Sequence, residues 1–307
     1  MKHQYKIIPI TKDEYEARLD RVVRKKFPYL NQGSIEKALR SKLILVNQQK
    51  VAANYRLALG DYVQVSLSLI KDNVFEPTRS IKINQEHLRL ITDNIIFQDN
   101  NLMVINKPAG LAVQGGSGIR VSVDDIMPKI LEMSETWSDE DSGHKLVHRL
   151  DKETSGILVI ALNNATAKDL AYYFKHHQVE KQYLAILKGR LKTDQGQVSS
   201  IINKYDKVIH EDNAITNYRV LAKKAHASFV EFLPITGKTH QLRLHSLELG
   251  FPILGDSKYD PEYSDGLNLH LHAAEIAIPY EGTTLRLRAA LPEYFKKNLK
   301  DIFGIKV

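Results

Sequence analysis

The sequence predicts an α+β fold: a strand-rich body with a mixed, mostly antiparallel sheet, preceded by a small basic α/β module. Short apolar runs typical of strands dominate from about residue 91 onward, and one good helical period interrupts them. The first 70 residues favour helices and a short hairpin instead. They also carry the whole net charge of +7, because residues 71–307 hold equal numbers of acidic and basic side chains. A basic module of this kind most often contacts nucleic acid or an anionic membrane.

The first predicted helix covers residues 13–27, DEYEARLDRVVRKKF. Its apolar side chains recur at helical spacing and form one arc: Tyr15, Leu19, Val22, Val23 and Phe27. Arg18, Arg21 and Lys25 fall on the opposite arc, which is either a contact surface for nucleic acid or an ordinary solvated face. A second short helix is expected to begin at an N-cap, Ser34, and to end at Arg40, which joins the candidate contacts.

The runs LILVN and DYVQVSL predict two short strands that complete a module over residues 13–70. Residues 71–90 show no clean period and contain Pro77, so they are predicted to be a linker. The body, residues 91–307, holds seven strand-like runs: NIIFQ, LMVIN, GILVIAL, QYLAILKG, NYRVLA, SFVEFLP and TLRLRA. Its one clear helix is predicted over 164–177, with Asn164 as the cap.

Composition excludes several classes of protein. The chain has no cysteine, which removes disulfides, thiolate catalysis and cysteine-based zinc sites together. The first 20 residues lack a long apolar core, and no run approaches the roughly 20 apolar residues of a membrane span, so neither a signal peptide nor a membrane partner is expected. The default expectation is a cytoplasmic protein.

Asp151 is the strongest candidate for chemistry. It lies between the polar residues His148, Arg149 and Lys152 and the apolar run GILVIA, which places it at the end of a buried strand, where a cleft can form. A carboxylate there can act as a nucleophile, a base or an electrostatic stabiliser. The alternative is a turn aspartate that caps the strand or pairs with a neighbouring cation.

Two further stretches carry candidate site residues. In TGKTHQLRLH, Arg243 shares a face with His245 if the stretch is a strand and with His240 if it is a helix. An arginine beside Asp151 would keep that carboxylate ionised, and the alternative is a phosphate contact or a surface charge. In KQYLAILKG, Tyr183 opens an apolar strand and can stack on a base, or is a half-buried strand tyrosine.

The loop NKPAGLAVQGGSG contains Lys107 among glycines, but its spacing matches no nucleotide-binding motif, so it is interpreted as backbone packing near a site. Four histidines suggest a metal: His240, His245, His270 and His272. No acidic residue lies at ligand spacing nearby, so no metal site is predicted.

Taken together, these stretches resemble the RluA family of pseudouridine synthases. HRLDKETSGILVIA is similar to the family's aspartate motif, KQYLAI to its tyrosine motif and TGKTHQLRLH to its arginine motif, while NKPAGLAVQGGSG resembles its opening loop. The four motifs agree in order and spacing and cover roughly residues 91–295. Residues 18–65 resemble the S-four-type RNA-binding module, and AVQGGSG with LRSKLILVNQQKV is similar to the RluC branch, which modifies large-subunit ribosomal RNA.

The resemblance implies a pseudouridine synthase fold and an isomerase that converts uridine in RNA to its C-glycoside. Asp151 would attack or deprotonate the ribose, with proton removal at C2′ as the favoured route. Arg243 would keep Asp151 charged, Tyr183 would stack on the flipped uracil, and Arg149 would enter the RNA stack. His148, Lys107 and the basic module would contact RNA. The reaction has no redox change and no net group transfer, so no cofactor is implied.

The partner implied by the resemblance is large-subunit ribosomal RNA, free or within an assembling subunit, and the chain is expected to be a monomer. Three alternatives belong to other classes or substrates. They are a non-catalytic RNA-binding protein that assists ribosome assembly, a pseudouridine synthase for transfer RNA, and a metal-dependent nuclease. The binding protein would not need Asp151, Tyr183 and Arg243 together, and the nuclease would need clustered acids.

Overall fold

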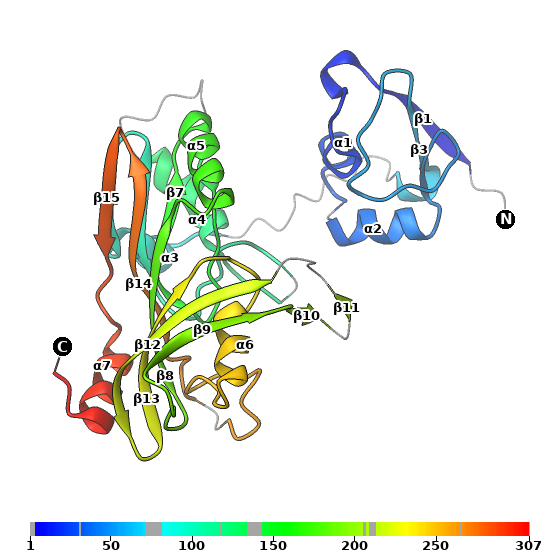
Figure 1. Cartoon of the computed structure of the whole chain (residues 1–307). Coiled ribbons are helices and arrows are strands. Elements are labelled where there is room, and N and C mark those ends of the chain that lie inside the picture. The colour runs from blue at the N-terminus through cyan, green and yellow to red at the C-terminus, as the bar shows by residue number, and fades with distance from the viewer. Residues whose placement is uncertain are drawn as a thin grey trace. The chain divides into compact units, whose positions relative to one another are not determined.

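The chain divides into two compact units, residues 1–80 and 81–307. Each has its own buried apolar cluster, and Figure 1 shows the elements of both. The computed structural model describes residues 4–30, 32–70, 82–116, 118–133, 143–204, 207–208, 213–263 and 266–306. Within these residues, no helix has both the length and the apolar character that crossing a membrane requires.

The small unit packs two helices against a three-stranded antiparallel sheet. Its elements are β1 (Tyr5–Pro9), α1 (Leu19–Lys26), α2 (Gln32–Arg40), β2 (Ile44–Val46) and β3 (Tyr62–Ser66), with 3₁₀ turns at Lys12–Glu14 and Leu67–Leu69. The strand order is β1-β3-β2. Apolar residues of both helices and all three strands meet in one core. Whether this unit is an S-four-type module stays a prediction, as do the domain bounds given above.

The first helix is shorter than predicted. It begins at Leu19 rather than at residue 13, because Glu16 has a left-handed backbone (φ 59°) and Arg18 is extended at the N-cap. The apolar arc is buried from Leu19 onward, but Tyr15 is exposed. The Arg18 guanidinium is bound to Asp20 at 2.6 Å. Arg18 therefore lies just outside the helix that carries Arg21 and Lys25, and its charge is paired.

The second helix also differs in its start. It begins at Gln32, so Ser34 lies within the helix and is not its N-cap. Arg40 is exposed at the helix end, and Arg21 and Lys25 are exposed one turn apart on α1. These three side chains remain open to a ligand, as the prediction requires.

The predicted linker ends in a helix. Residues 71–81 lie outside the described part of the chain, but α3 covers Gln85–Thr92. Asn84 caps it by accepting a hydrogen bond from the His87 amide at 2.9 Å. Leu88 and Ile91 are buried against the large unit's core. This helix has only eight residues, which is too few for a helical pattern of apolar residues to be recognised in the sequence.

The large unit is built on one long mixed sheet, whose strands are labelled in Figure 1. The strand order is β4-β5-β7-β14-β8-β13-β12-β9, with β6 on β7 and β15 on β14. All named pairs are antiparallel except β7 with β14. The strands are β4 (Ile95–Gln98), β5 (Leu102–Lys107), β6 (Lys145–Leu146), β7 (Ser155–Ala161), β8 (Glu180–Leu187), β9 (Gln195–Ser200), β12 (Ala214–Lys224), β13 (Ala227–Pro234), β14 (Leu271–Tyr280) and β15 (Thr283–Arg288). A small separate hairpin joins β10 (Asn203–Lys204) to β11 (Lys207–Val208). The predicted fold class is confirmed.

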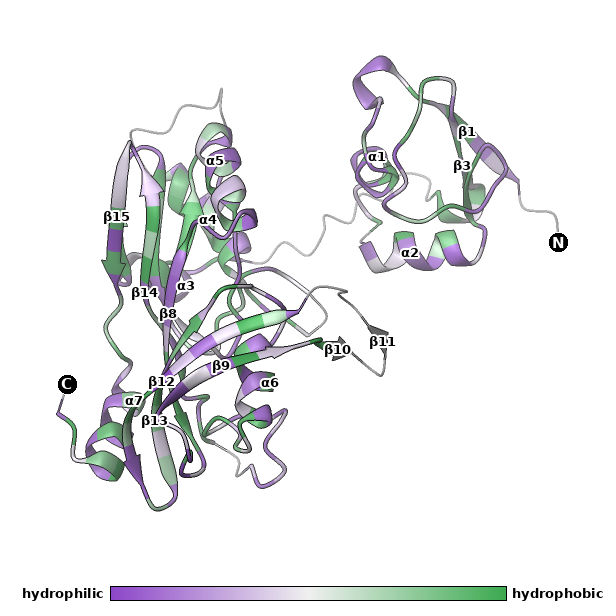
Figure 2. Cartoon of the chain, viewed as in Figure 1, coloured by the Kyte–Doolittle hydropathy of each residue, from purple (hydrophilic) through white to green (hydrophobic). Residues whose placement is uncertain are grey.

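Helices cover both faces of the first half of this sheet. The other helices are α4 (Val123–Glu132), α5 (Asn164–Lys175), α6 (Gln241–Glu248) and α7 (Glu293–Asn298), followed by one π-helical turn (Leu299–Phe303). Alternate residues of β7 point to opposite sides, so Leu158 faces the core under α3 and α4 while Val159 faces the core under α5. Figure 2 shows the resulting apolar strands. The helix predicted over 164–177 is present, but its cap is Asn163, not Asn164.

Candidate active site

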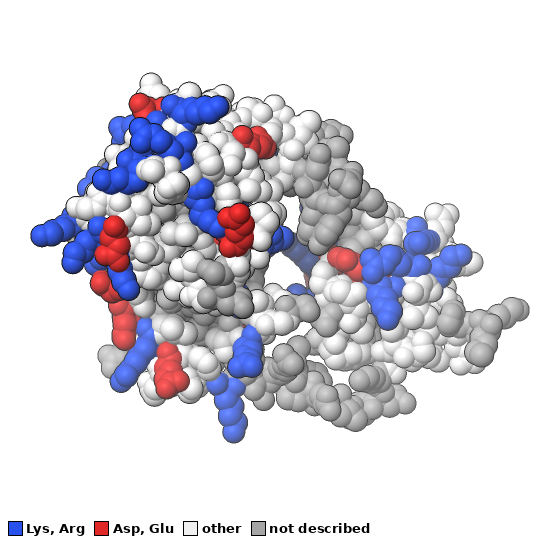
Figure 3. Space-filling view, turned by 90° about the horizontal axis from the view of Figure 1, so that it is seen from below, with Lys and Arg blue, Asp and Glu red and all other residues white. Residues whose placement is uncertain are grey.

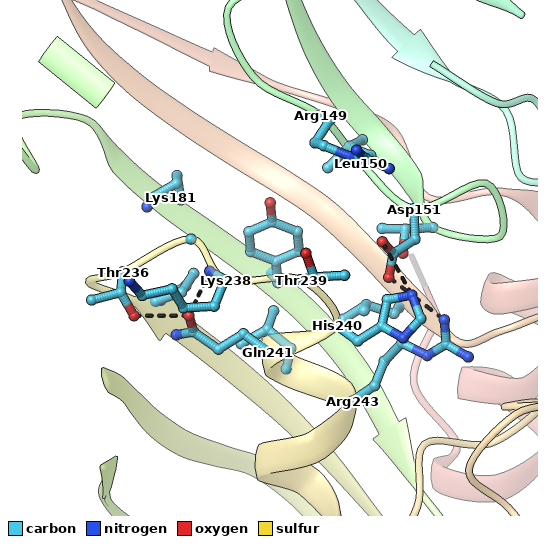
Figure 4. A pocket seen from close by; sticks show the side chains of 16 residues that line it. Arg149, Leu150, Asp151, Lys181, Thr236, Lys238, Thr239, His240, Gln241 and Arg243 are labelled. Carbon is cyan, nitrogen blue, oxygen red and sulfur yellow. Dashed lines mark hydrogen bonds and ion pairs between the residues drawn. The ribbon is translucent and has the colours of Figure 1, made fainter. Parts of the chain in front are cut away.

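The candidate site is a cavity of about 130 Å³ in the large unit. Asp151, Tyr183 and Arg243, which come from three separate parts of the chain, all line it. Figure 4 shows Asp151 and Arg243 at one end of the cavity and Lys181 at the other. The volume is below the roughly 300–1,000 Å³ of drug-sized ligand sites. The cavity is therefore sized for a small group.

Asp151 lies in the turn that leads into β7. The Thr154 amide donates to the Asp151 carbonyl at 3.1 Å, which closes the turn. Gly156 has a positive φ of 110°, and a Cβ at that position would overlap the backbone of Ala273 on β14. The glycine thus lets β14 come close beside the start of β7. The Asp151 side chain is 21% exposed, so it is held by the fold and still accessible to a substrate.

Arg243 faces Asp151 from a helix, not from a strand. QLRLHSLE forms α6, and His240 precedes it in a left-handed backbone (φ 56°). His240 at the N-cap and Arg243 in the first turn both point to the carboxylate (Figure 4). Arg243 Nη1 lies 3.5 Å from Asp151 Oδ2, and His240 Nε2 lies 3.7 Å from Oδ1. Of the two faces that the sequence left open, the helical pairing of Arg243 with His240 is the one that forms.

A second carboxylate holds the arginine from behind. Asp256 accepts hydrogen bonds from Arg243 Nε at 2.8 Å and from Nη2 at 2.6 Å, and its side chain is fully buried. Burial alone lowers the pKa of Arg243, but the hydrogen bonds and charge of Asp256, with the charge of Asp151, raise it above its ordinary value. The guanidinium therefore stays cationic and presents its third nitrogen to Asp151.

Tyr183 lies on β8 with an apolar strand on each side, paired with Phe232 and Ala273. Burial raises the pKa of its phenol, and the charge of Asp151 raises it further. The hydroxyl therefore stays protonated near neutral pH. A neutral ring in the wall of a small cavity suits stacking on a base, and the hydroxyl can donate a hydrogen bond there.

Lys107 was expected to contact RNA, and this prediction is wrong. The side chain is fully buried at the end of β5. Its ammonium donates to the carbonyls of Pro108, Leu111 and Lys152 at 2.8–3.2 Å. Burial lowers its pKa to about 7, against the opposing charges of Glu153 and Asp151. Lys107 joins the glycine-rich loop to the turn that carries Asp151, and it has no surface to offer to a ligand.

His148 was also expected to contact RNA, and its ring is likewise used by the fold. The Val159 amide donates to His148 Nε2 at 2.8 Å, and the imidazole stacks on Phe174 with a centroid distance of 4.7 Å. Burial lowers the pKa of His148 to about 3, so the ring is neutral. The next residue, Arg149, is exposed and lines the cavity, which agrees with its predicted place at the site.

Several lining residues were missed by the sequence reasoning. The loop from Thr236 to His240 forms one wall, and Gln241 fixes it by accepting from Thr236 Oγ1 at 2.8 Å and from the Lys238 amide at 2.9 Å. Lys181 lines the cavity from β8, and burial lowers its pKa to about 8. The loop lies within the stretch TGKTHQLRLH and Lys181 within KQYLAI, so membership of the same stretches as Arg243 and Tyr183 was the available signal.

Two further histidines of the set, His270 and His272, make contacts within the fold. His272 Nδ1 lies 2.9 Å from Ser155 Oγ, and Asn298 Nδ2 lies 2.8 Å from His270 Nε2. Burial lowers the pKa of both imidazoles. In the described part of the chain, histidine and acidic side chains form no group of three that suits a metal ion.

Known proteins similar to this chain agree with the geometry. Residues 101–248 match the family model described as RNA pseudouridylate synthase, and this segment contains Asp151, Tyr183 and Arg243. Ribosomal large subunit pseudouridine synthase C of Rickettsia bellii (strain RML369-C) is 40% identical over 298 residues, which cover 92% of this chain and 96% of that protein. The protein of the same name from Escherichia coli (strain K12) is 28% identical over 317 residues, covering 97% and 96%.

A solved structure gives the same result for the fold. Human RNA Pseudouridylate Synthase Domain Containing 4 is 32% identical, with a TM-score of 0.59, and the match covers 69% of this chain and 94% of that one. The predicted family is therefore confirmed by a relative that matches almost from end to end and by a solved structure that matches more than two thirds of the chain. This chain belongs to the RNA pseudouridine synthases, the isomerases that convert uridine in RNA to pseudouridine.

Proposed function

We propose that this enzyme isomerises specific uridines in large-subunit ribosomal RNA, with Asp151 as its catalytic group and without a cofactor. The observation that carries the choice of RNA is the 40% identity to a large-subunit ribosomal enzyme across nearly the whole of both chains, small unit included. Neither the transfer-RNA substrate nor the binding-only alternative has an observation in its favour. Mapping pseudouridine in ribosomal RNA from a strain that lacks this gene tests the proposal, and an unchanged large-subunit map would contradict it.

In the proposed reaction Asp151 removes the proton at C2′ while the bond between N1 and C1′ breaks, and it returns that proton after the uracil has turned. Arg243 and His240, 3.5 and 3.7 Å away, direct N–H groups at the carboxylate and orient it. The C5–C1′ bond then forms, C5 loses its proton, and N1, which kept the electron pair of the broken bond, takes up a proton in exchange, so atoms and electrons balance without a redox partner. Activity that persists in EDTA separates this reaction from hydrolysis by a metal-dependent nuclease, which would stop.

Tyr183 is proposed to stack on the uracil inside the cavity. Tyr183→Phe keeps the ring, so most of the turnover should survive if stacking is the main role, because stacking is the larger contribution at about 1–3 kcal/mol per base. Tyr183→Ala should lose both stacking and turnover. Turnover by each variant, with RNA affinity measured alongside, tests this. Wild-type turnover by Tyr183→Ala would remove the residue from the site, and a large loss in Tyr183→Phe would assign a proton relay to the hydroxyl.

Arg149 is proposed to fill the place that the flipped uridine leaves in the RNA stack, since chemistry on a stacked base needs its extrusion. The small unit, with Arg21, Lys25 and Arg40 exposed, is proposed to add sequence-tolerant phosphate contacts. Figure 3 shows Lys and Arg side chains on the surface of each unit. These contacts fix the protein on RNA, and the cavity selects the base.

Removing the small unit should weaken RNA binding more than chemistry. A chain that begins near residue 81 keeps its own cores and its site residues. It should fold and still isomerise uridine at high RNA concentration. For every phosphate that the shortened protein no longer binds, the slope of log affinity against log salt should fall by about 0.7–0.9. RNA affinity over a salt series, for full-length and shortened protein, is the measurement; equal slopes would show that the basic residues do not touch RNA.

RNA is the macromolecular partner, either free or within an assembling subunit, and the protein acts as a monomer in the cytoplasm. Pairing turnover on protein-free ribosomal RNA with turnover on isolated precursor subunits distinguishes the two substrate forms. Sedimentation of the purified chain tests the monomer.

A further inference from the structure

The turn that follows Gly255 places two side chains behind the groups that face Asp151. Asp256 is buried and bidentate to Arg243, and it also accepts from the Lys258 amide at 3.0 Å and the Tyr259 amide at 3.1 Å. Gly255 has a φ of 80°, and a Cβ there would overlap the carbonyl of Asn268. The close approach of Gly255 to Asn268 therefore sets the conformation of the turn, and the backbone amides of the turn hold the Asp256 carboxylate in place.

Tyr259, three residues later, contacts both groups. Its hydroxyl lies 2.7 Å from His240 Nδ1, and the Arg243 guanidinium carbon lies 5.0 Å from its ring centroid. Lys258 Nζ also lies 3.4 Å from His240 Nδ1. An ammonium only donates hydrogen bonds, so Nδ1 is the acceptor. Burial lowers the pKa of His240, against the opposing charge of Asp151, and the neutral ring then carries its proton on Nε2, toward Asp151.

We propose that Asp256 and Tyr259 are positioning residues for the isomerisation: one turn holds Arg243 and His240 so that a guanidinium N–H and an imidazole N–H both point at Asp151. Asp256 occupies Nε and Nη2 of the arginine, which leaves Nη1 as the nitrogen nearest Asp151. Tyr259 sets the tautomer and ring orientation of His240. The inference rests on the proposed role of Asp151 and extends it to residues that do not touch the substrate.

A structural role alone would give a different result from a positioning role. The charged or titratable groups that interact with Asp151 are Arg243, His240, Tyr183 and Lys107. Asp256→Asn removes one negative charge behind Arg243, so the cation is less compensated and the ionised carboxylate of Asp151 is favoured. The acidic limb of the pH–rate profile should move to lower pH. Because a misplacement of about 1 Å can cost roughly 10²-fold, kcat should fall about tenfold to a hundredfold.

Asp260→Asn is the matched control for Asp256→Asn. Asp260 belongs to the same segment, is also buried, and is bound to a lysine, Lys188, at 2.9 Å, away from the cavity lining. Its replacement should cost stability without moving the pH profile or kcat. KM for RNA should stay within about threefold in both variants, because phosphate contacts supply most of the binding.

Tyr259→Phe tests the second half of the proposal and leaves the buried ion pair intact, so it remains assayable if Asp256→Asn folds poorly. It keeps the ring beside Arg243 and loses the hydrogen bond to His240. We expect kcat to fall about threefold to tenfold, the worth of one hydrogen bond, with KM unchanged. Tyr263→Phe, whose hydroxyl donates to the Leu267 carbonyl at 3.2 Å, is the control and should keep wild-type kcat.

The outcomes separate this inference from the proposed function. The positioning role would be overturned if Asp256→Asn folded and kept the wild-type kcat and acidic limb, or if Tyr259→Phe kept the wild-type kcat. In either case an inactive Asp151→Asn protein would still support the proposed chemistry. Loss of kcat in both variants, with the pH shift in Asp256→Asn and none in Asp260→Asn, is the expected result.

Discussion

Replacing Asp151 by Asn should abolish turnover while leaving RNA affinity within about threefold of wild type. The amide has the size of the carboxylate but can neither accept a proton nor attack carbon. General acid–base catalysis alone contributes about 10²–10⁴-fold, so a loss of at least that size is expected. Binding should persist because most contacts to nucleic acid are made to phosphate and sugar. Turnover on uridine-containing RNA and RNA affinity in the same buffer measure the two effects.

The geometry makes Asp151→Asn a clean substitution. Arg243 keeps its buried partner, Asp256, so no unpaired charge is left in the interior. Asp151 itself is 21% exposed, and its part in the turn is made by its backbone carbonyl, which the variant retains. Glu153→Gln is the control, since it removes a carboxylate two residues away that is 42% exposed and 3.7 Å from Lys152. If Asp151→Asn turned over uridine as fast as Glu153→Gln, the catalytic assignment would be wrong.

The sequence motifs predicted which residues meet in the candidate site. Asp151, Tyr183 and Arg243 are spread over some 90 residues, and nothing in their local periods brings them together. Their order and spacing, compared with a known family, gave the expectation that one cavity holds all three, and all three line it. Apolar runs predicted the strands of the sheet. A run such as GILVIA has no polar face, so it must be covered on both sides, and every residue of β7 is in fact buried.

The predictions for Lys107 and His148 failed for the same reason: the local sequence pattern does not show that these polar side chains are used inside the fold. Lys107 ends a strand whose residues are almost all buried, and its ammonium donates to two carbonyls of the loop that follows and to the carbonyl of Lys152, 45 residues away. His148 stacks on Phe174, 26 residues away. In both cases the partner comes from tertiary structure, so a basic side chain beside a motif was taken for an RNA contact when the fold itself uses it.

Helix α6 shows the limit of periodicity. QLRLH alternates apolar and polar residues as a strand does, yet it folds as a helix in which Gln241, Arg243 and His245 are all buried. A helix that is buried on most of its faces has no apolar stripe to recognise. Asp256 could not be recognised from the sequence either, because a Gly-Asp pair is typical of an ordinary turn. Only the structure shows that its carboxylate binds Arg243.

Replacing Arg243 by Met should lower turnover by about 10²-fold or more, the usual cost of removing one fixed donor aimed at a reacting group. Without the cation, protonation of the Asp151 carboxylate becomes easier, so the acidic limb of the pH–rate profile should move to higher pH, opposite to the shift expected for Asp256→Asn. RNA affinity should change less than rate. An unchanged acidic limb would instead identify Arg243 as a phosphate contact.

The buried pair complicates this variant and also supplies its control. Arg243→Met leaves Asp256 without its cation in the interior, which costs about 3–5 kcal/mol of stability. Adding Asp256→Asn removes the stranded charge, so the double variant should regain much of that stability, measured by denaturant unfolding, without regaining turnover. Arg219→Met, which removes a guanidinium paired with Glu231 at 3.0 Å and absent from the cavity lining, should leave turnover and the pH profile unchanged. Recovery of turnover in the double variant would mean that Arg243 acts through stability alone, and its absence places the loss at the 3.5 Å contact with Asp151.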